Sequence, residues 1–503
     1  GCLGCAVAAA ISTVKPFHPT LHDEYSYLLG ADTLLHGRLA NPTPKAWEAL
    51  QTFHVIMQPA YASKYPLAQS ASIALGWWFL GIPLAGAWLG AGLASVSAVW
   101  MLAGVASRGW AILGGLIVAF HPAMQTAWSY SLAGGWLTFA ASMMVLGGVL
   151  RLRRQNTEQA KLSAAVMGCG IGMMALSRPF EGLVFTLGAL GLLLVSWISD
   201  DKPMNWDKVL RVGGIAGVPV ALALLLTAAQ NQATTGSVFT MPYQAHEASY
   251  GVAPLFVFGS VNSLDSEAWP TVMSRYHYGW SLQCFEERTG GLGWLRGIAV
   301  AAGVVVGFGG FSLTLLPAAS LFWTGRHRFV MGVLAILGLQ VAASATVCWV
   351  FPHYLAPLWA CLLLVAVLGL RRLLSGFSRT VRVQILAGLL TLQVVQLGGA
   401  AYSLRTATDR DWAAERARVS ERLMNMEGDH LVFVQYDSDH IVHQEWVYNT
   451  ADLDSARIIW AHFEEGRWQA EVRQAYGRER SVWLLEVEEN ESLEAETVLR
   501  PLS

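Results

Sequence analysis

Runs of predominantly apolar residues recur along the first 401 positions, and most are close to the length of about 20 residues that a helix needs to cross a bilayer. The first run, GCLGCAVAAAISTV, is shorter and begins without methionine, so we expect the natural N-terminus to lie upstream. The pattern predicts about eleven transmembrane helices. They are expected at 1–14, 84–107, 109–120, 128–150, 162–176, 183–198, 209–228, 297–323, 329–349, 355–370 and 384–401.

The last hundred residues show a different pattern. Short apolar stretches that predict β-strands, HLVFVQYD, EWVYN, ARIIWAH and SVWLLEVE, alternate with polar segments of helical character. This alternation predicts a small α/β domain at 403–503 after a transmembrane body at 1–402. The expected fold class is therefore an all-α polytopic membrane protein with a soluble C-terminal α/β domain.

Composition supports this division. The chain of 503 residues is 54% hydrophobic and only 14% charged, has 21 tryptophans and a mean hydropathy of +0.41, and so departs from ordinary soluble domains. The net charge of −2 is distributed unevenly along the chain, because residues 404–503 contain 21 of the 35 acidic residues but only 11 of the 33 basic ones. The six cysteines lie mostly in apolar segments, which predicts no disulfide framework.

Lysine and arginine in the short loops predict the orientation. If the spans alternate, the basic loops share one side, which should be the cytoplasmic face. The polar clusters and the C-terminal domain then share the extracytoplasmic side, which predicts a single site there. The basic segments are Arg108, 151–155, 200–208, 325–328 and 371–382, and the opposite segments are 15–69, 121–122, 177–182, 229–295 and 351–354.

The first external loop contains an acidic pair, Asp23 and Glu24. Apolar residues follow it at helical spacing, which predicts an amphipathic helix along the membrane interface that ends before Asn41 and Pro42. Adjacent helical residues point about 100° apart, so one carboxylate should face the site while the other supports it. The alternative is that both acids only stabilise a helix N-terminus.

The same loop carries a family resemblance. An Asp-Glu pair after the first span, a GR..NP stretch at 37–42 and an aromatic-rich segment ending in Lys64-x-Pro66-Leu67 resemble the C-fold (GT-C) glycosyltransferases. The chain is most similar to bacterial relatives of protein O-mannosyltransferases and of lipid A aminoarabinose transferases. The resemblance implies that Asp23 is the catalytic base and that Lys64 binds the phosphate of a polyprenyl-phosphate sugar donor. Tyr65 replaces a proline of the family pattern, and Ser26 replaces an arginine found in some relatives.

Two further segments fit the phosphate side of such a reaction, which needs cations or hydrogen-bond donors for the departing phosphate. Arg178 stands at the end of a span, where it could bind phosphate or pair with Glu181. His353 and Tyr354 in FPHYLAP resemble the YxLP element of aminoarabinose transferases, although they could instead belong to an interfacial aromatic belt. Lys64 likewise has the alternative of extending to the bilayer surface without a ligand.

The external loop 229–295 is long enough to be functional. Tyr243, His246 and Glu247 are candidates for substrate binding, and further aromatic residues that could stack on sugars are Tyr250, Tyr276, Tyr278 and Trp280. A divalent metal is a minority hypothesis, because no His-x-x-x-His spacing is present. Its candidate ligands are His18, His22, His246, Glu247 and His353.

Taken together, the patterns and the resemblance predict an inverting glycosyltransferase that moves a sugar from a polyprenyl phosphate to an extracytoplasmic glycan, lipid or protein. No nucleic-acid partner is expected. The alternative is a non-catalytic or transport-type envelope protein, such as a lipid-linked glycan flippase or polymerase, which should carry charges within its spans. A sensor whose acidic tail is the working part is a third class. In that tail, Asp437, Asp439 and His440 are expected to form a solvated turn.

Overall fold

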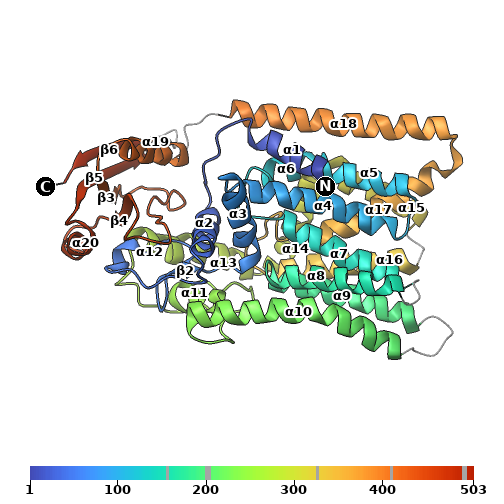
Figure 1. Ribbon diagram of the computed structural model, residues 1–503, viewed down its shortest axis with the longest axis horizontal. Helices are drawn as coiled ribbons and strands as arrows, with labels where there is room; N and C mark the ends of the chain where they lie inside the picture. The colour runs from blue at the N-terminus through green and yellow to red at the C-terminus, as the bar shows by residue number, and fades with distance from the viewer. Residues whose placement is uncertain (154–157, 199–205, 325–327, 408–411, 490–494, 503) are drawn as a thin grey trace.

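The computed structural model describes residues 1–153, 158–198, 206–324, 328–407, 412–489 and 495–502. Long helices lie side by side in a bundle, and a domain containing a β-sheet is attached at one end of it (Figure 1). The bundle confirms the predicted polytopic helical body. Its main helices are α4 (Ala85–Ala103), α5 (Arg108–Ala119), α7 (Trp136–Leu152), α8 (Glu158–Ala175), α9 (Pro179–Ile198), α10 (Trp206–Thr235), α14 (Gly293–Gly310), α15 (Leu316–Thr324), α16 (Arg328–Ala345), α17 (Leu358–Leu373) and α18 (Arg379–Thr406).

Seven helices in the described part of the chain are long and apolar enough to cross a membrane. The count rises to eight if α5 and α6 (Pro122–Trp128), which meet at 47°, form one broken span. Every predicted run coincides with a helix, and several of these helices are shorter than 18 residues. The sequence interpretation missed one apolar helix, α3 (Leu67–Leu80), because its run follows the polar segment that ends at Pro66.

The bundle has an apolar interior and an apolar periphery. Trp359 of α17 and Phe139 of α7 are fully buried between helices, whereas Leu225 of α10 and Val395 of α18 are 68% and 64% exposed. Large apolar side chains on the outside of a helical bundle are those expected to contact lipid. The periphery of α10 and α18 therefore marks the membrane-facing surface.

Hydrogen bonds between helix ends identify one end of the bundle. The Trp197 indole of α9 donates to the carbonyl oxygen of Leu152 at 3.3 Å, and Arg371 of α17 donates to the carbonyl of Val105 at 3.2 Å. Arg108 and the basic segment that begins at Arg371 thus lie at this end. The predicted basic positions 154–155, 200–205 and 325–327 lie outside the described residues.

A layer of short elements covers the other end of the bundle and separates it from the C-terminal domain (Figure 1). The layer is rich in polar and aromatic residues, as predicted for the external loops. It comprises α2 (His22–Leu35), η1 (Trp47–Leu50), β1 (Val55–Ile56), β2 (Ala62–Ser63), α3, α11 (Pro242–Tyr250), α12 (Thr271–Ser274), η2 (Arg275–Ser281) and α13 (Leu282–Thr289), and α1 (Cys2–Ser12) precedes it.

The C-terminal domain is an α/β domain, as predicted. Its four-stranded sheet has the order β4-β3-β5-β6, in which β3 (Asp429–Tyr436) is parallel to β4 (Ile458–His462) and β5 (Arg480–Glu489), and β6 (Ala495–Pro501) is antiparallel to β5. The helices α19 (Trp412–Met424) and α20 (Gln469–Tyr476) complete it.

The prediction of a strand at 445–449 is wrong. This segment is a buried irregular loop. The Glu445 carboxylate accepts hydrogen bonds from the Tyr436 hydroxyl at 2.5 Å and from the Val447 amide at 2.6 Å. Because the side chain binds these groups locally, the segment adopts a turn-like conformation instead of joining the sheet.

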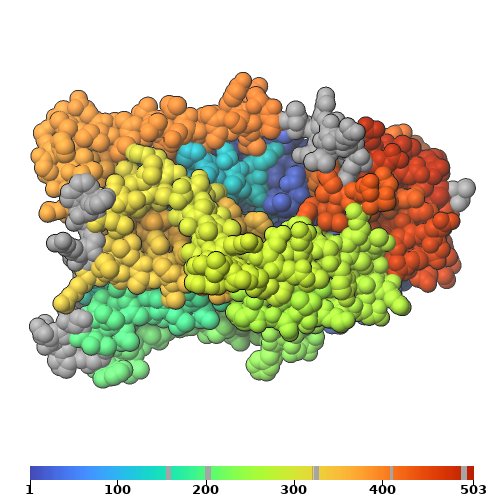
Figure 2. Space-filling view, turned by 180° about the vertical axis from the view of Figure 1, so that it is seen from behind, coloured from blue at the N-terminus to red at the C-terminus, as the bar shows by residue number. Residues whose placement is uncertain are grey.

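The C-terminal domain and the first external loop share one hydrophobic core. Apolar side chains of 29–61 pack against the sheet, and the Asp32 carboxylate of α2 accepts a hydrogen bond from the Ala451 amide at 2.7 Å. From behind, Figure 2 shows the domain (red) against the yellow-green segment near 250–290, with blue N-terminal residues at the bottom of a hollow beside them. The residues that form this core include Leu29, Leu50, Val55, Met57, Tyr61, Leu431, Phe433, Ile459, Val472 and Leu484.

Candidate active site

Asp23 lies in the first turn of α2, where its carboxylate is only half-buried. The Tyr65 hydroxyl donates a hydrogen bond to Asp23 Oδ1. The Tyr65 ring is itself fixed by stacking on Tyr27 one turn further along α2, with ring centroids 4.4 Å apart and an interplanar angle of 22°. Asp23 is thus a carboxylate of fixed orientation whose other oxygen remains available to a substrate.

Glu24 points elsewhere and is almost completely buried. One oxygen accepts hydrogen bonds from the amides of Thr20 and Leu21 at 2.9 and 3.1 Å, and the other accepts from the Ser131 hydroxyl and the Leu132 amide at 2.7 and 2.9 Å. Burial raises the pKa of Glu24, and these hydrogen bonds oppose the rise. The geometry suits a residue that fixes the start of α2 against the 131–132 loop.

Lys64 follows β2 and is buried to 8% exposure. Its ammonium lies 5.5 and 5.7 Å from the ring centroids of Tyr65 and Tyr243, and none of the described carboxylates lies within 4 Å of it. Burial lowers the pKa of Lys64, whereas the charges of Glu247 and Asp23 raise it. A buried cation without a close counterion is costly unless an anion is bound beside it.

Arg178, between α8 and α9, supplies a second cation. Its guanidinium carbon lies 4.3 Å from the ring centroid of Tyr354. Burial raises the pKa of the Tyr354 hydroxyl to about 12, with Arg178 opposing and Asp23 adding to the rise, so these groups share one electrostatic environment. Pro179 begins α9, and Glu181 lies in its first turn without an ion pair to Arg178 within 4 Å.

His353 lies beside Tyr354, with ring centroids 4.7 Å apart. Its Nε2 atom is buried and has no hydrogen-bond partner within the described chain. Burial lowers the pKa of His353 to about 3, and the Arg178 charge adds to this effect. A neutral imidazole can donate one hydrogen bond from this position without adding charge.

Helix α11 brings the predicted residues of the long loop to the same place. Tyr243 meets Tyr65 edge-on at 5.5 Å, His246 is buried, and Glu247 is close enough to Lys64 to raise its pKa. By contrast, Tyr250 and Tyr276 pack in an apolar cluster with Phe53 and Trp269, and Tyr278 donates to the carbonyl oxygen of Leu264.

The metal hypothesis finds no support in the arrangement. Across the described ranges, no three His, Cys, Asp or Glu side chains are placed to share a metal ion. The His22 Nδ1 atom lies 2.7 Å from the Tyr448 hydroxyl and its Nε2 atom 3.4 Å from His443 Nδ1, so it contacts the C-terminal domain. Burial and the charge of His443 lower the pKa of His22 to about 3.

Several site residues escaped the sequence interpretation. Tyr65 departs from the family pattern, yet it holds Asp23. Ser26, the other departure, donates to the carbonyl oxygen of His54 at 2.6 Å and bonds to Ser63 at 2.8 Å, which fixes α2 on the β1–β2 hairpin. His443 and Tyr448 reach the site from a segment about 420 residues away, and no local signal could have indicated this.

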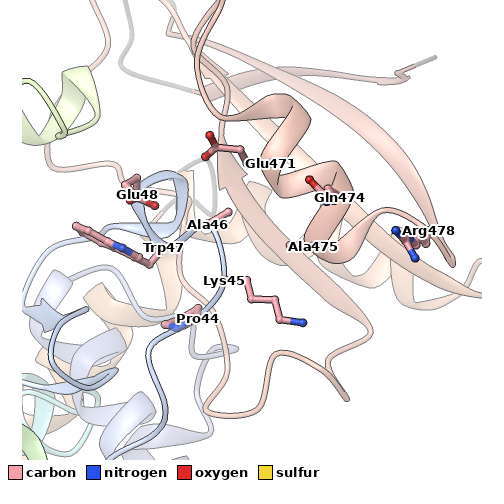
Figure 3. A pocket seen from close by; sticks show the side chains of 9 residues that line it. All are labelled: Pro44, Lys45, Ala46, Trp47, Glu48, Glu471, Gln474, Ala475 and Arg478. Carbon is pink, nitrogen blue, oxygen red and sulfur yellow. The ribbon is translucent and has the colours of Figure 1, made fainter.

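A separate groove of about 720 Å³ lies between the 44–48 loop and α20 (Figure 3). Lys45 and Arg478 lie on one side of it, Glu471 and Gln474 line its α20 wall, and Trp47 points away from both cations. The Tyr476 hydroxyl donates to the carbonyl of Lys45 at 3.2 Å, which joins the two walls. This groove shares no residue with the Asp23 cluster and is open to solvent.

Comparison with solved structures relates this architecture to known folds. ArnT from Cupriavidus metallidurans bound to undecaprenyl phosphate matches 97% of this chain over 92% of its own, with a TM-score of 0.51 and 11% identity. Its apo state matches equally well, with a TM-score of 0.52 and 10% identity over 97% of this chain and 91% of its own. The chain has the GT-C fold.

The GT-C fold also occurs in the oligosaccharyltransferase of Archaeoglobus fulgidus, in a complex with Zn and sulfate. That structure matches 86% of this chain with a TM-score of 0.50 and 12% identity, and this chain spans 59% of its length. No family model and no curated protein matches the sequence. At such low identity the GT-C likeness establishes architecture, and the chemistry has to be argued from the residues.

Proposed function

We propose that this protein is a membrane glycosyltransferase that moves a sugar from a polyprenyl phosphate to an acceptor on the side of the membrane that carries the C-terminal domain. The observation that carries the proposal is the presence, in one electrostatic environment, of the oriented Asp23 carboxylate and the buried Lys64 ammonium, which has no described carboxylate within 4 Å. The GT-C fold and the undecaprenyl phosphate bound by ArnT support a lipid phosphate as the donor.

In this reaction, Asp23 takes the proton of the acceptor hydroxyl as its oxygen attacks the anomeric carbon. The bond between that carbon and the phosphate oxygen breaks, and its electron pair leaves with the polyprenyl phosphate. Lys64 and Arg178 hold the growing phosphate charge, and His353 and Tyr354 donate hydrogen bonds to it. A single displacement of this kind inverts the anomeric carbon.

Glu24 has a supporting role in this proposal, because both of its oxygens are bound by backbone amides and a hydroxyl. Tyr243, His246 and Glu247 are assigned to substrate binding in this proposal. The localisation that follows is a bacterial plasma membrane, with the Asp23 cluster and the C-terminal domain extracytoplasmic. The proposed mechanism assigns no role to a divalent metal.

The test is an Asp23→Asn substitution, which preserves size and leaves an oxygen that can accept from Tyr65. General-base catalysis contributes about 10² to 10⁴ in rate, so turnover of undecaprenyl-phosphate sugars by the purified variant should fall by that factor. Donor binding, measured in parallel, should be retained. Near-normal turnover would show that Asp23 is not the catalytic base. This result would contradict the transferase mechanism and favour a transport-type protein.

A further inference from the structure

Three histidines from distant segments of the chain converge in the layer that contains Lys64. His54 precedes β1, His246 lies on α11 and His277 lies in η2. The ring centroid of His246 is 6.0 Å from that of His54 and 6.4 Å from that of His277. The charge of Lys64 contributes to lowering the pKa of each of the three histidines.

These imidazoles carry buried nitrogens without hydrogen-bond partners among the described residues. Both nitrogens of His246, Nε2 of His277 and Nδ1 of His54 are in this state. His246 and His277 are only 2% and 6% exposed, and the nearest Glu247 oxygen is 4.0 Å from His246 Nδ1, beyond hydrogen-bond distance. Buried polar atoms in folded proteins are rarely left unpaired, so a concentration of them points to a ligand.

The backbone also holds one of the rings in an uncommon position. His54 has φ 62°, in the left-handed region that few residues other than glycine adopt. The Ser26 hydroxyl fixes this conformation through the carbonyl oxygen of His54. Such local constraint is characteristic of residues that a binding site positions.

The protonation state of the rings restricts the ligand. Burial, followed by the charge of Lys64, lowers the pKa of His277 to about 3, and the same causes lower the pKa of His54 and of His246 well below the usual value. At neutral pH each ring is therefore uncharged, with one nitrogen that donates and one that accepts. Hydroxyl groups, which also donate and accept, match this set better than an anion does.

Aromatic rings pack against His277. The His277 ring stacks on Tyr250 at 5.9 Å and lies 5.5 Å from Trp269. Imidazole nitrogens beside aromatic rings are complementary to a pyranose, whose faces are apolar and whose edge carries the hydroxyls.

We propose that His54, His246 and His277 form the pocket that recognises the hydroxyl groups of a neutral donor sugar, while Lys64 holds the phosphate attached to it. The assignment rests on the proposed function and adds the class of sugar. We assign this sugar to the donor because the charge of Lys64, the proposed phosphate ligand, acts on all three histidines.

The test compares two ligands, undecaprenyl phosphate alone and undecaprenyl phosphate carrying mannose or glucose, by equilibrium binding in detergent. Wild-type protein should bind at least one sugar-bearing lipid more tightly than the bare lipid, by about tenfold for one or two hydrogen bonds. His246→Phe and His277→Phe should abolish this difference while leaving bare lipid binding unchanged. His36→Phe, at an exposed position on the end of α2, is the control.

The phenylalanine variants should fold, because the nitrogens that they remove have no partner in the described chain. The proposed sugar pocket would be contradicted if the variants lost affinity equally for the bare and the sugar-bearing lipids. The absence of a sugar preference in the wild type, or a change confined to the acceptor KM, would also contradict it. So would stabilisation of the wild type, but not of the variants, by zinc. Failure of the wild type to bind either lipid would instead contradict the proposed function itself.

Discussion

The Tyr65 hydroxyl donates its hydrogen bond to Oδ1 of Asp23, and the Tyr65 ring stacks on Tyr27 of the same helix. A residue that departs from the family pattern therefore holds the proposed base in place. The neighbouring Lys64 comes from the same short segment, so residues 64 and 65 together position the proposed base and the proposed phosphate-binding cation.

Removing this hydroxyl should impair the chemical step more than binding. For Tyr65→Phe we expect kcat to fall by about 10- to 100-fold, because a hydrogen bond to a charged group is worth roughly 1.5 to 3 kcal/mol, with little change in the KM for the donor. Tyr278→Phe, which loses a hydroxyl bound to the backbone at Leu264 in the same layer, is the matched control. A rise in KM with unchanged kcat would place Tyr65 in donor binding instead.

Glu24 should contribute to stability. Glu24→Ala leaves four donors without their acceptor, three of them backbone amides. The Leu132 amide among them is buried, and an unpaired buried group costs about 1 to 3 kcal/mol. The variant should therefore show a clearly lower Tm in detergent, and Glu24→Gln a smaller decrease. If Glu24→Gln keeps the wild-type Tm and loses turnover as fully as Asp23→Asn, Glu24 acts in catalysis.

Lys64→Ala should weaken undecaprenyl phosphate binding by about 10- to 100-fold, the value of one charge-assisted contact. Because burial lowers the pKa of Lys64, binding to the wild type should also decline as alkaline pH removes this proton, earlier than an ordinary lysine would allow. The substitution of Lys45 by alanine, at an exposed position in the outer groove, is the control for lost positive charge. Unchanged affinity of the Lys64 variant would indicate that the ammonium only extends towards the bilayer surface.

Truncation after Tyr402 should leave the helices in the membrane, since each satisfies its own backbone hydrogen bonds. Turnover should nevertheless be lost, because α2 shares its core with the C-terminal sheet and His22 contacts Tyr448. The measurements are membrane fractionation, protease sensitivity of residues 15–65, and donor turnover. An active truncated protein would show that the domain is accessory.

Orientation can be tested in intact cells with a membrane-impermeant thiol reagent, after the six native cysteines are replaced by serine. Phe239→Cys, at a position that is 90% exposed after α10, should be labelled. Ser375→Cys, exposed at the basic end of α17, should not. The reverse labelling pattern would place the Asp23 cluster in the cytoplasm.

The sequence predicted the elements well wherever a local pattern determines them. Helical periodicity located α2, and apolar runs located the bundle, because burial in lipid or protein requires such runs. Helix α3 was missed and the loop at 445–449 was predicted as a strand, because both conformations depend on neighbours in space. Helix α3 packs on α2 and α4, and Glu445 binds Tyr436. Contacts such as those of His22 with Tyr448 leave no trace in local periodicity.

The core that joins residues 29–61 to the C-terminal sheet also imposes an order on biosynthesis. Chains emerge from the ribosome N-terminal end first, at about 5–20 residues per second, so α2 is made long before the strands that cover it. The helix that carries Asp23 must remain incompletely packed until the final hundred residues have been made and have folded. A nascent chain that stalls within the bundle would therefore hold its lipid-facing helices in place without an assembled reaction centre.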